Sequence, residues 1–298
     1  MKEFKGVVAA MVTPFNEDGS INLTQEKNLV NYFIEKGIHG ILVSGGTGEA
    51  SLMNLNERKQ AIKTASDILK DTELFCVAGV SCASTSDSIE LAKYSSDAGV
   101  DYILVQPPHG YPVTKEGILS YFKEIKENIE CGMILYHFPD ETGVEFSPEE
   151  IVEMSRSGLF QAIKNTTSME HTMELILENG HNSSTKIVNG FDSLVLASLS
   201  CGSDGIITSG VNMVPAQFVE IYNLIQKNNL QQAAQIYEAI LPLLNLQEIE
   251  GNTEPGICKY CLKLLGVDAG IPRKPIEPIS ESAKIAVENA LRKMNSIF

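Results

Sequence analysis

The chain has 298 residues, 43% of them hydrophobic and 20% charged, which is the composition of a globular protein. Its formal net charge of -15 repels phosphate backbones, so nucleic acid is not an expected partner. No apolar run approaches the roughly 18 residues that span a membrane, and the stretch 7–12 is too short for a signal peptide. These observations predict a cytoplasmic protein without a membrane partner.

Short apolar runs alternate with longer amphipathic segments along the chain. The runs are rich in β-branched residues and lack alternation with polar residues, as expected of parallel strands buried on both faces. They recur at about the length of a βα unit and comprise residues 6–11, 40–43, 74–80, 102–105, 133–136, 161–163, 186–188 and 205–207. Eight βα units predict a closed (β/α)8 TIM barrel, which we place at residues 1–227 as the catalytic domain.

The segments between the runs carry signals for helix ends. Ser147, Pro148 and Glu150 predict an N-cap followed by a capping box, and Asn54 with Glu57 is a similar start. Glycines stand where helices should end, at positions 37, 99, 158, 180, 202 and 266. The alternative architecture, an open doubly wound sheet, usually shows a GxGxxG turn after its first strand, whereas Val-Thr-Pro-Phe follows here.

More helix follows the eighth run than one barrel unit needs. Helical patterns cover residues 215–227, 230–244, 253–265 and 281–294. The last three predict a C-terminal helical region, residues 228–298, which should pack on the barrel because no low-complexity linker separates the two.

Six cysteines are scattered along the chain, which argues against a disulfide framework. Cys258 and Cys261 form one CxxC pair, but they share helical spacing with Leu262 and Leu265, so we interpret them as core residues. Neither a second CxxC nor an HExxH motif occurs in the sequence, and we expect no metal site.

Polar residues that end apolar runs are candidates for chemistry, because barrel enzymes build their sites at the carboxyl ends of strands. Lys164 ends the sixth run, where desolvation at a barrel mouth would lower its pKa and expose a nucleophilic amine. Tyr136 ends the fifth run, on the neighbouring strand, and its phenol can transfer protons. The structural alternatives are a lysine that reaches solvent and an aromatic residue at the barrel rim.

Three further segments after strands add candidates for substrate binding. Gly46 and Thr47 lie in the glycine-rich loop after the second run, whose N–H groups suit a carboxylate. Gly190 and Asp192 follow the seventh run, where the backbone of Gly190 could offer hydrogen bonds to the same carboxylate, and Ile207 ends the eighth. An ordinary βα turn is the alternative for each segment, and no nearby lysine or arginine supports a phosphorylated substrate.

Together, these short motifs resemble the dihydrodipicolinate synthase / N-acetylneuraminate lyase family along nearly the whole chain. The matching segments are 12–15, 45–49, 136–139 with 142–143, 163–164, 189–192 and 263–266. The resemblance implies a (β/α)8 barrel, a helical C-terminal region, a homo-oligomer (tetramer or dimer) and no metal or organic cofactor. It also implies that Lys164 forms an imine with pyruvate, that Tyr136 transfers protons, and that Thr47 with the Gly46 N–H holds the carboxylate.

Three departures from the synthase branch of that family bear on the substrate. Gly46 stands where the first of two loop threonines is expected, and Glu141 stands where an arginine grips the carboxylate of the aldehyde. The tyrosine lent across the subunit interface aligns with His109. The segment that contains Gly190 and Asp192 is similar to the lyase branch, in which this carboxylate meets sugar hydroxyls.

We therefore expect a Schiff-base aldolase, or lyase, that joins or splits pyruvate and an aldehyde. The substrate would be a sugar acid, either a 2-keto-3-deoxy acid or a compound like N-acetylneuraminate. The alternatives are 4-hydroxy-tetrahydrodipicolinate (dihydrodipicolinate) synthase, a 5-dehydro-4-deoxyglucarate dehydratase-like enzyme, and a non-catalytic barrel that binds a 2-oxo acid.

Overall fold

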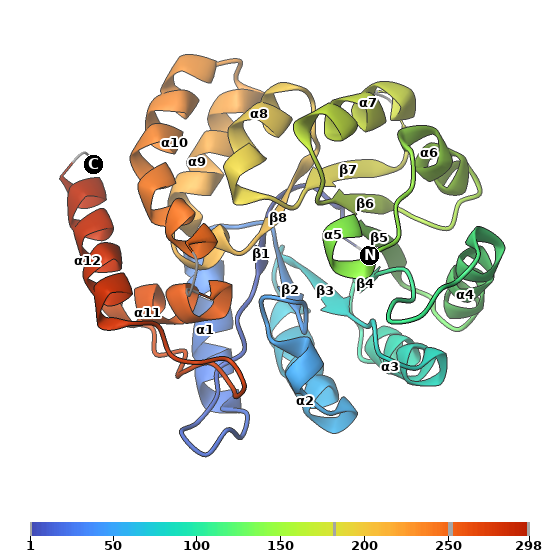
Figure 1. Ribbon diagram of the computed structural model, residues 1–298, viewed down its shortest axis with the longest axis horizontal. Helices are drawn as coiled ribbons and strands as arrows, with labels where there is room; N and C mark the ends of the chain where they lie inside the picture. The colour runs from blue at the N-terminus through green and yellow to red at the C-terminus, as the bar shows by residue number, and fades with distance from the viewer. Residues whose placement is uncertain (1, 181–182, 250–252, 297–298) are drawn as a thin grey trace.

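The protein is described by a computed structural model that covers residues 2–180, 183–249 and 253–296. Eight parallel strands close into a barrel in chain order, with β1 paired to both β2 and β8 (Figure 1). They are β1 (Gly6–Ala10), β2 (Gly40–Val43), β3 (Phe75–Gly79), β4 (Tyr102–Val105), β5 (Gly132–His137), β6 (Ala162–Asn165), β7 (Lys186–Asn189) and β8 (Gly205–Thr208). The predicted TIM barrel is confirmed.

The strands β5 and β6 extend further than the apolar runs predicted. The apolar run 161–163 was expected to end at Lys164, and the ladder continues one residue further, through the pairs Lys164–Val188 and Asn165–Asn189. A polar side chain does not interrupt a strand, because the ladder uses only backbone groups. Lys164 and Tyr136 therefore lie within strands, each one residue before the strand ends.

Helices surround the barrel on its outside, as Figure 1 shows. They are α1 (Leu23–Glu35), α2 (Leu55–Leu69), α3 (Thr85–Asp97), α4 (Lys115–Glu127), α5 (Pro139–Thr142), α6 (Pro148–Arg156), α7 (Met169–Asn179), α8 (Val195–Ser200) and α9 (Pro215–Gln226). The predicted capping boxes are present at the starts of α2 and α6. The six glycines expected after helices all have positive φ, which a residue with a Cβ adopts only with strain.

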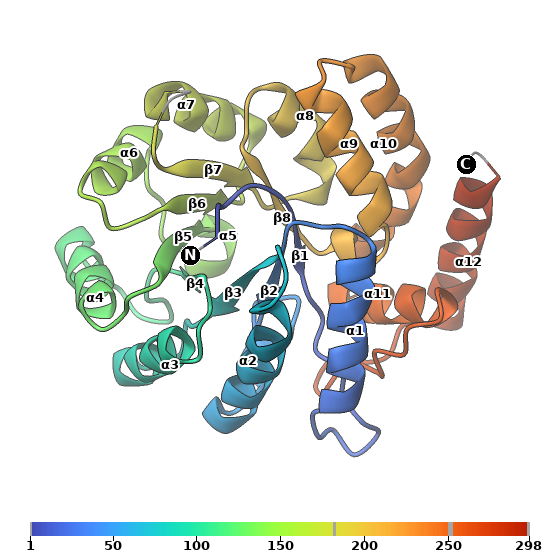
Figure 2. The same ribbon diagram turned by 180° about the vertical axis from the view of Figure 1, so that it is seen from behind.

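An aromatic cluster closes the amino-terminal end of the barrel. The rings of Phe4, Phe75 and Tyr102 lie 5.0 to 5.7 Å apart, centroid to centroid. The Tyr102 hydroxyl donates to the Lys2 carbonyl at 2.7 Å and ties down the segment before β1, which crosses this end of the barrel in Figure 2. A ligand therefore has to enter from the opposite end, where the strands terminate at their carboxyl ends.

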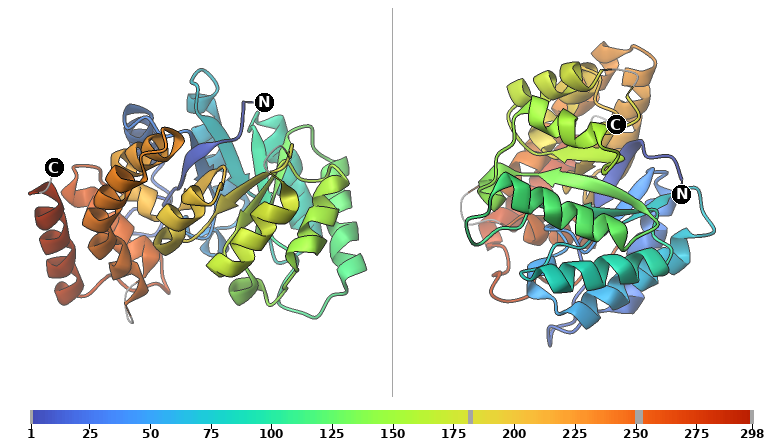
Figure 3. Two further views of the ribbon diagram at one scale, coloured as in Figure 1. Left: turned by 90° about the horizontal axis from the view of Figure 1, so that it is seen from above. Right: turned by 90° about the vertical axis from the view of Figure 1, so that its right-hand side faces the viewer.

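Three helices follow the barrel: α10 (Leu230–Leu244), α11 (Glu254–Leu264) and α12 (Glu281–Asn295). They stand together at one side of the barrel, drawn orange to red in Figure 3. Cys258 and Cys261 are fully buried in α11, which confirms that they are core residues. The division into a catalytic domain and a C-terminal region at residue 227 stays a prediction.

Within the described ranges, no helix has both the length and the apolar character to cross a membrane. The same residues contain no group of three or more His, Cys, Asp or Glu side chains placed to hold a metal ion.

Candidate active site

The strand register places Lys164 and Tyr136 side by side. They are directly paired across β5 and β6, and the Lys164 Nζ lies 3.9 Å from the centroid of the Tyr136 ring. Lys164 is only 6% exposed. The alternative of a lysine that reaches solvent is therefore excluded for this residue.

Burial lowers the pKa of the Lys164 amine to about 8, against the opposing influence of the Glu254, Glu141 and Asp192 carboxylates. At pH 7 such a group is neutral in about a tenth of the molecules, far more often than a lysine in water. A neutral amine has the lone pair that attacks a carbonyl carbon. Lys164 is thus prepared to act as a nucleophile near neutral pH.

Tyr136 keeps its proton under the same conditions. Burial, reinforced by the negative charge of Glu141, raises the pKa of its phenol well above the ordinary value. A protonated phenol beside an amine can donate its hydrogen to an oxygen that forms or leaves next to it.

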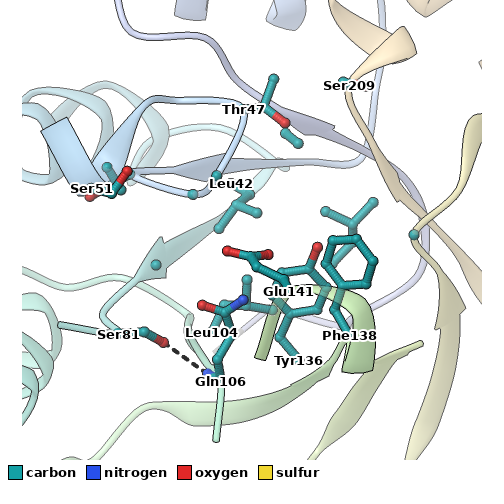
Figure 4. Close-up of a pocket in the computed structure, with 18 of the residues that line it drawn as sticks. Leu42, Thr47, Ser51, Ser81, Leu104, Gln106, Tyr136, Phe138, Glu141 and Ser209 are labelled. Carbon is teal, nitrogen blue, oxygen red and sulfur yellow. Dashed lines mark hydrogen bonds between the residues drawn. The ribbon is translucent and has the colours of Figure 1, made fainter. Parts of the chain in front are cut away.

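All nine candidate residues line one cavity of about 960 Å³ at the carboxyl ends of the strands. They are Gly46, Thr47, His109, Tyr136, Glu141, Lys164, Gly190, Asp192 and Ile207. Figure 4 draws Tyr136, Glu141 and Phe138 together, with Thr47 across the cavity from them. The structure therefore brings together residues from loops that are far apart in the sequence.

The glycine-rich loop is held in a strained shape at both ends. Ser44 and Glu49 each have a φ of 59°, in the left-handed region that side chains with a Cβ rarely adopt. The buried Arg58 donates from Nε to the Ser44 hydroxyl at 2.7 Å. At the other end, Lys259 Nζ lies 2.6 Å from the Glu49 carboxylate, and both side chains are almost fully buried.

Because α11 supplies Lys259, the C-terminal region fixes the loop that carries the candidate binding residues Gly46 and Thr47. The backbone N–H of Arg273 also donates to Glu49, at 2.7 Å. Between the two strained ends, the N–H groups of Gly46 and Thr47 donate to no other described residue. Two adjacent unused N–H groups form a ready site for a carboxylate.

Glu254 is a site residue that we did not predict from the sequence. It begins α11, lines the cavity, and accepts a hydrogen bond from the Thr47 hydroxyl. Its charge is also the largest favourable influence on the protonated form of Lys164. No motif marks Glu254, since only the closure of the C-terminal region over the barrel brings it to Thr47.

Gly190 contributes space rather than a free N–H group. We predicted that its backbone could offer hydrogen bonds to a carboxylate, but its N–H donates to the Asn165 carbonyl at 3.0 Å. A Cβ at this position would lie 1.9 Å from Thr166 Oγ1 and 2.9 Å from Lys164 Cε. Glycine is required here because the side chains of Thr166 and Lys164 occupy the space that a Cβ would need.

Asp192 accepts more hydrogen bonds from other residues of the protein than its place in the sequence suggested. Its Oδ2 accepts from the Ser209 hydroxyl, the Gly210 N–H and Gln247 Nε2, at 2.9 to 3.1 Å. Its other oxygen, Oδ1, is buried without a hydrogen-bond partner among the described residues. The carboxylate therefore joins the β7 and β8 loops to the C-terminal region in addition to lining the cavity.

A buried network orients the strand that carries Lys164. His137 Nε2 accepts from the Phe146 N–H at 3.1 Å, so its Nδ1 bears the proton and donates to Asn165 Oδ1 at 2.9 Å. Burial lowers the pKa of His137 to about 4, which keeps this tautomer neutral. Asn165 adjoins Lys164, so the network fixes the backbone beside the Lys164 amine.

The fold and site define a class of protein: a (β/α)8 barrel with a buried lysine of lowered pKa beside a tyrosine at the carboxyl ends of its strands. Residues 3–294 match the family described as the dihydrodipicolinate synthetase family. The chain belongs to this family, and it is a lyase of the class I aldolase type, which works through a lysine Schiff base.

Individual relatives agree with this assignment over almost the whole chain. A 4-hydroxy-tetrahydrodipicolinate synthase from Methanosarcina mazei is 30% identical, with 98% of each chain covered. A crystal structure of a dihydrodipicolinate synthase has a TM-score of 0.89 at 29% identity, covering 98% of this chain and 99% of that one. The CdNal protein from Clostridium difficile, solved in complex with mannosamine, has a TM-score of 0.91 at 25% identity, covering 98% and 100%.

Proposed function

We propose that this protein is a pyruvate-dependent aldolase that forms or cleaves a carbon–carbon bond between pyruvate and a hydroxylated aldehyde. The observation that carries the proposal is the buried Lys164 amine against the ring of Tyr136. The product or substrate would be a sugar acid of the 2-keto-3-deoxy or N-acetylneuraminate type.

The reaction begins when Lys164 Nζ attacks the carbonyl carbon of pyruvate. Loss of water gives an imine, and loss of a methyl proton gives an enamine, with the protonated imine as the electron sink. The enamine carbon attacks the aldehyde carbon, and the aldehyde oxygen takes up a proton. Hydrolysis of the imine releases the product and restores the amine.

In this reaction Tyr136 transfers the protons, and the N–H groups of Gly46 and Thr47 hold the pyruvate carboxylate. The free state of those N–H groups supports the second role. The Thr47 hydroxyl donates to Glu254, so it joins the carboxylate only by exchanging partners. His109, Ile207 and Asp192 line the space left for the aldehyde.

Dihydrodipicolinate synthase is the second candidate, because relatives that match the whole chain bear that name. Glu141 argues against it, since a carboxylate in the cavity repels the carboxylate of aspartate semialdehyde, where an arginine would bind it. The dehydratase alternative has no observation of its own in this site. Membership of a lyase family sets the non-catalytic barrel aside.

The deciding experiment measures turnover with two groups of substrates. We expect the wild-type protein to release pyruvate from one or more members of a panel of sugar acids. Lys164→Arg should stop this release, because arginine keeps the positive charge but does not form the imine. The protein would instead be a synthase if it condensed pyruvate rapidly with aspartate semialdehyde and released pyruvate from none of the sugar acids.

We also propose that the chain acts as a homo-oligomer, a dimer or tetramer, in the cytoplasm. Met173 and Leu177, one helical turn apart on α7, are 43% and 70% exposed, which supports a contact with another copy. Sedimentation of the wild type and of Leu177→Lys tests this: a smaller species in the variant is expected, and a monomeric wild type contradicts it.

A further inference from the structure

Two aromatic side chains meet across the carboxyl end of the strand that carries Lys164. Phe138 follows β5 and Phe191 follows β7, and these two strands flank β6 on either side. Their ring centroids lie 5.9 Å apart at an interplanar angle of 89°, the edge-to-face arrangement that aromatic pairs favour. Both rings line the cavity that also contains the Lys164 side chain.

The Phe138 ring lies close to the Lys164 amine. Its centroid is 5.9 Å from that of the Tyr136 ring, with 27° between the two planes, and Lys164 Nζ is 3.9 Å from the same Tyr136 centroid. Figure 4 draws the Phe138 and Tyr136 rings beside one another in the cavity. An aldehyde that is joined to pyruvate on Lys164 would therefore bring its carbon chain within reach of the Phe138 ring.

The ring pair presents an apolar surface whose nearby carbonyls are already hydrogen-bonded. Both side chains are half-buried, so part of each ring faces the cavity. The Phe138 carbonyl accepts from the N–H groups of Glu141 and Thr142, at 3.2 and 3.0 Å. The Phe191 carbonyl accepts from Asn189 Nδ2 at 2.6 Å. A hydroxyl packed against the rings would lose water without gaining these carbonyls as partners, whereas a methyl group there is favourable.

We propose that Phe138 and Phe191 are specificity-determining residues that select an aldehyde with a methyl group at its far end. This inference rests on the proposed function and narrows the substrate class of the same site. The sugar acid would be a deoxy compound, in which pyruvate is joined to a hydroxylated aldehyde that lacks its terminal hydroxyl. The methyl group would pack against the two rings.

The test compares lactaldehyde and glyceraldehyde of the same configuration in condensation with pyruvate. The two aldehydes share the hydroxyl next to the carbonyl and differ at the third carbon, which is a methyl group in lactaldehyde and a hydroxymethyl group in glyceraldehyde. We expect kcat/KM for lactaldehyde to exceed that for glyceraldehyde by about tenfold, as an apolar pocket discriminates one small group. A ratio at or below one would overturn the proposal.

Variants assign the preference to the two rings. Phe138→Asn and Phe191→Asn replace a ring with a polar amide, and each should bring the ratio of the two kcat/KM values toward one. Phe138→Leu keeps an apolar side chain and should keep the ratio well above one. The ratio cancels any loss of folded protein or of pyruvate binding, because both aldehydes are affected equally.

Leu264→Asn is the matched control, since Leu264 is 44% exposed on α11 and does not line the cavity. It removes an apolar side chain as Phe138→Asn does, and it should leave the ratio unchanged. A ratio that both asparagine variants at the rings leave intact would show that the rings do not contact the aldehyde.

Trapping of pyruvate on Lys164 with borohydride separates this inference from the proposed function. If pyruvate is trapped but glyceraldehyde reacts as well as lactaldehyde, or neither aldehyde reacts, only the methyl preference is wrong. If pyruvate is not trapped, the proposed function fails, and this inference fails with it.

Discussion

The Thr47 hydroxyl donates a hydrogen bond to the carboxylate of Glu254, which lies 207 positions further along the chain. The same carboxylate is the main electrostatic support of the Lys164 ammonium group. The C-terminal region therefore acts on both the loop that would hold the substrate carboxylate and the amine that would react.

Glu254 should set the pH at which the enzyme becomes active. With the pKa of Lys164 at about 8, kcat/KM should fall as the pH drops below this value, because the ammonium form has no lone pair. Glu254→Gln removes the largest interaction that favours the ammonium form, so the midpoint should move to lower pH. A pH profile of kcat/KM for both proteins measures this, and a midpoint that moves upward contradicts it.

Tyr136→Phe should reduce kcat by about 10²–10⁴-fold, the usual contribution of a positioned acid–base group. The ring is retained, so the packing against Lys164 should survive and the melting temperature should change little. Stopped-flow measurement of pyruvate turnover tests the loss of kcat, and thermal unfolding tests the unchanged melting temperature. An active variant would remove the phenol from the mechanism.

Lys259→Met should destabilise the protein and disturb the glycine-rich loop together. Removing one partner of a buried ion pair leaves an uncompensated charge, which costs about 3–5 kcal/mol. Here the stranded charge is Glu49, in its left-handed conformation. Chemical unfolding should show the loss, and KM for pyruvate should rise. The double variant Glu49→Gln, Lys259→Met should recover part of the stability, and no recovery would contradict this account.

Glu26 should make the protein less stable as the pH rises. Its carboxyl is fully buried in α1 without a hydrogen-bond partner among the described residues. Burial raises the pKa of this group well above its ordinary value of 4.5. Folding thus favours the protonated carboxyl. Its contribution to the free energy of unfolding is fully present below the pKa that Glu26 has in the unfolded chain. That contribution is lost as the pH rises through the folded pKa.

Glu26→Met removes the unpartnered group at similar volume. We expect the free energy of unfolding at pH 8 to rise by about 1–3 kcal/mol, with a smaller gain at pH 5. Denaturant unfolding of both proteins at the two pH values measures this. An equal effect at both would show that the carboxyl does not titrate as its burial requires.

Glu141→Arg with Gly46→Thr should shift substrate choice toward aspartate semialdehyde. A side chain fits at position 46, because a Cβ there meets no atom within 4 Å. The arginine would replace repulsion of the second carboxylate with a charged hydrogen bond, a change of about tenfold or more in kcat/KM. Coupled assays of the single and double variants test this, and unchanged rates would argue that neither position contacts the aldehyde.

The barrel, and the pairing of Lys164 with Tyr136 on adjacent strands, could be predicted from the sequence because both depend on local pattern. Apolar runs without alternation mark buried parallel strands, and Lys164 and Tyr136 stand out as polar ends of adjacent runs. The contacts of Glu254 with Thr47 and of Lys259 with Glu49 join residues more than 200 positions apart. Such pairs depend on how the C-terminal region closes on the barrel, which no local signal records.

A pyruvate-dependent aldolase of this type should form an imine between Lys164 and pyruvate. Incubation with pyruvate and borohydride, followed by peptide mass spectrometry, tests it directly. We predict one reduced pyruvyl group on the peptide that contains Lys164 and none in Lys164→Arg. An adduct on a different lysine, or an unmodified protein after reduction, would contradict the account.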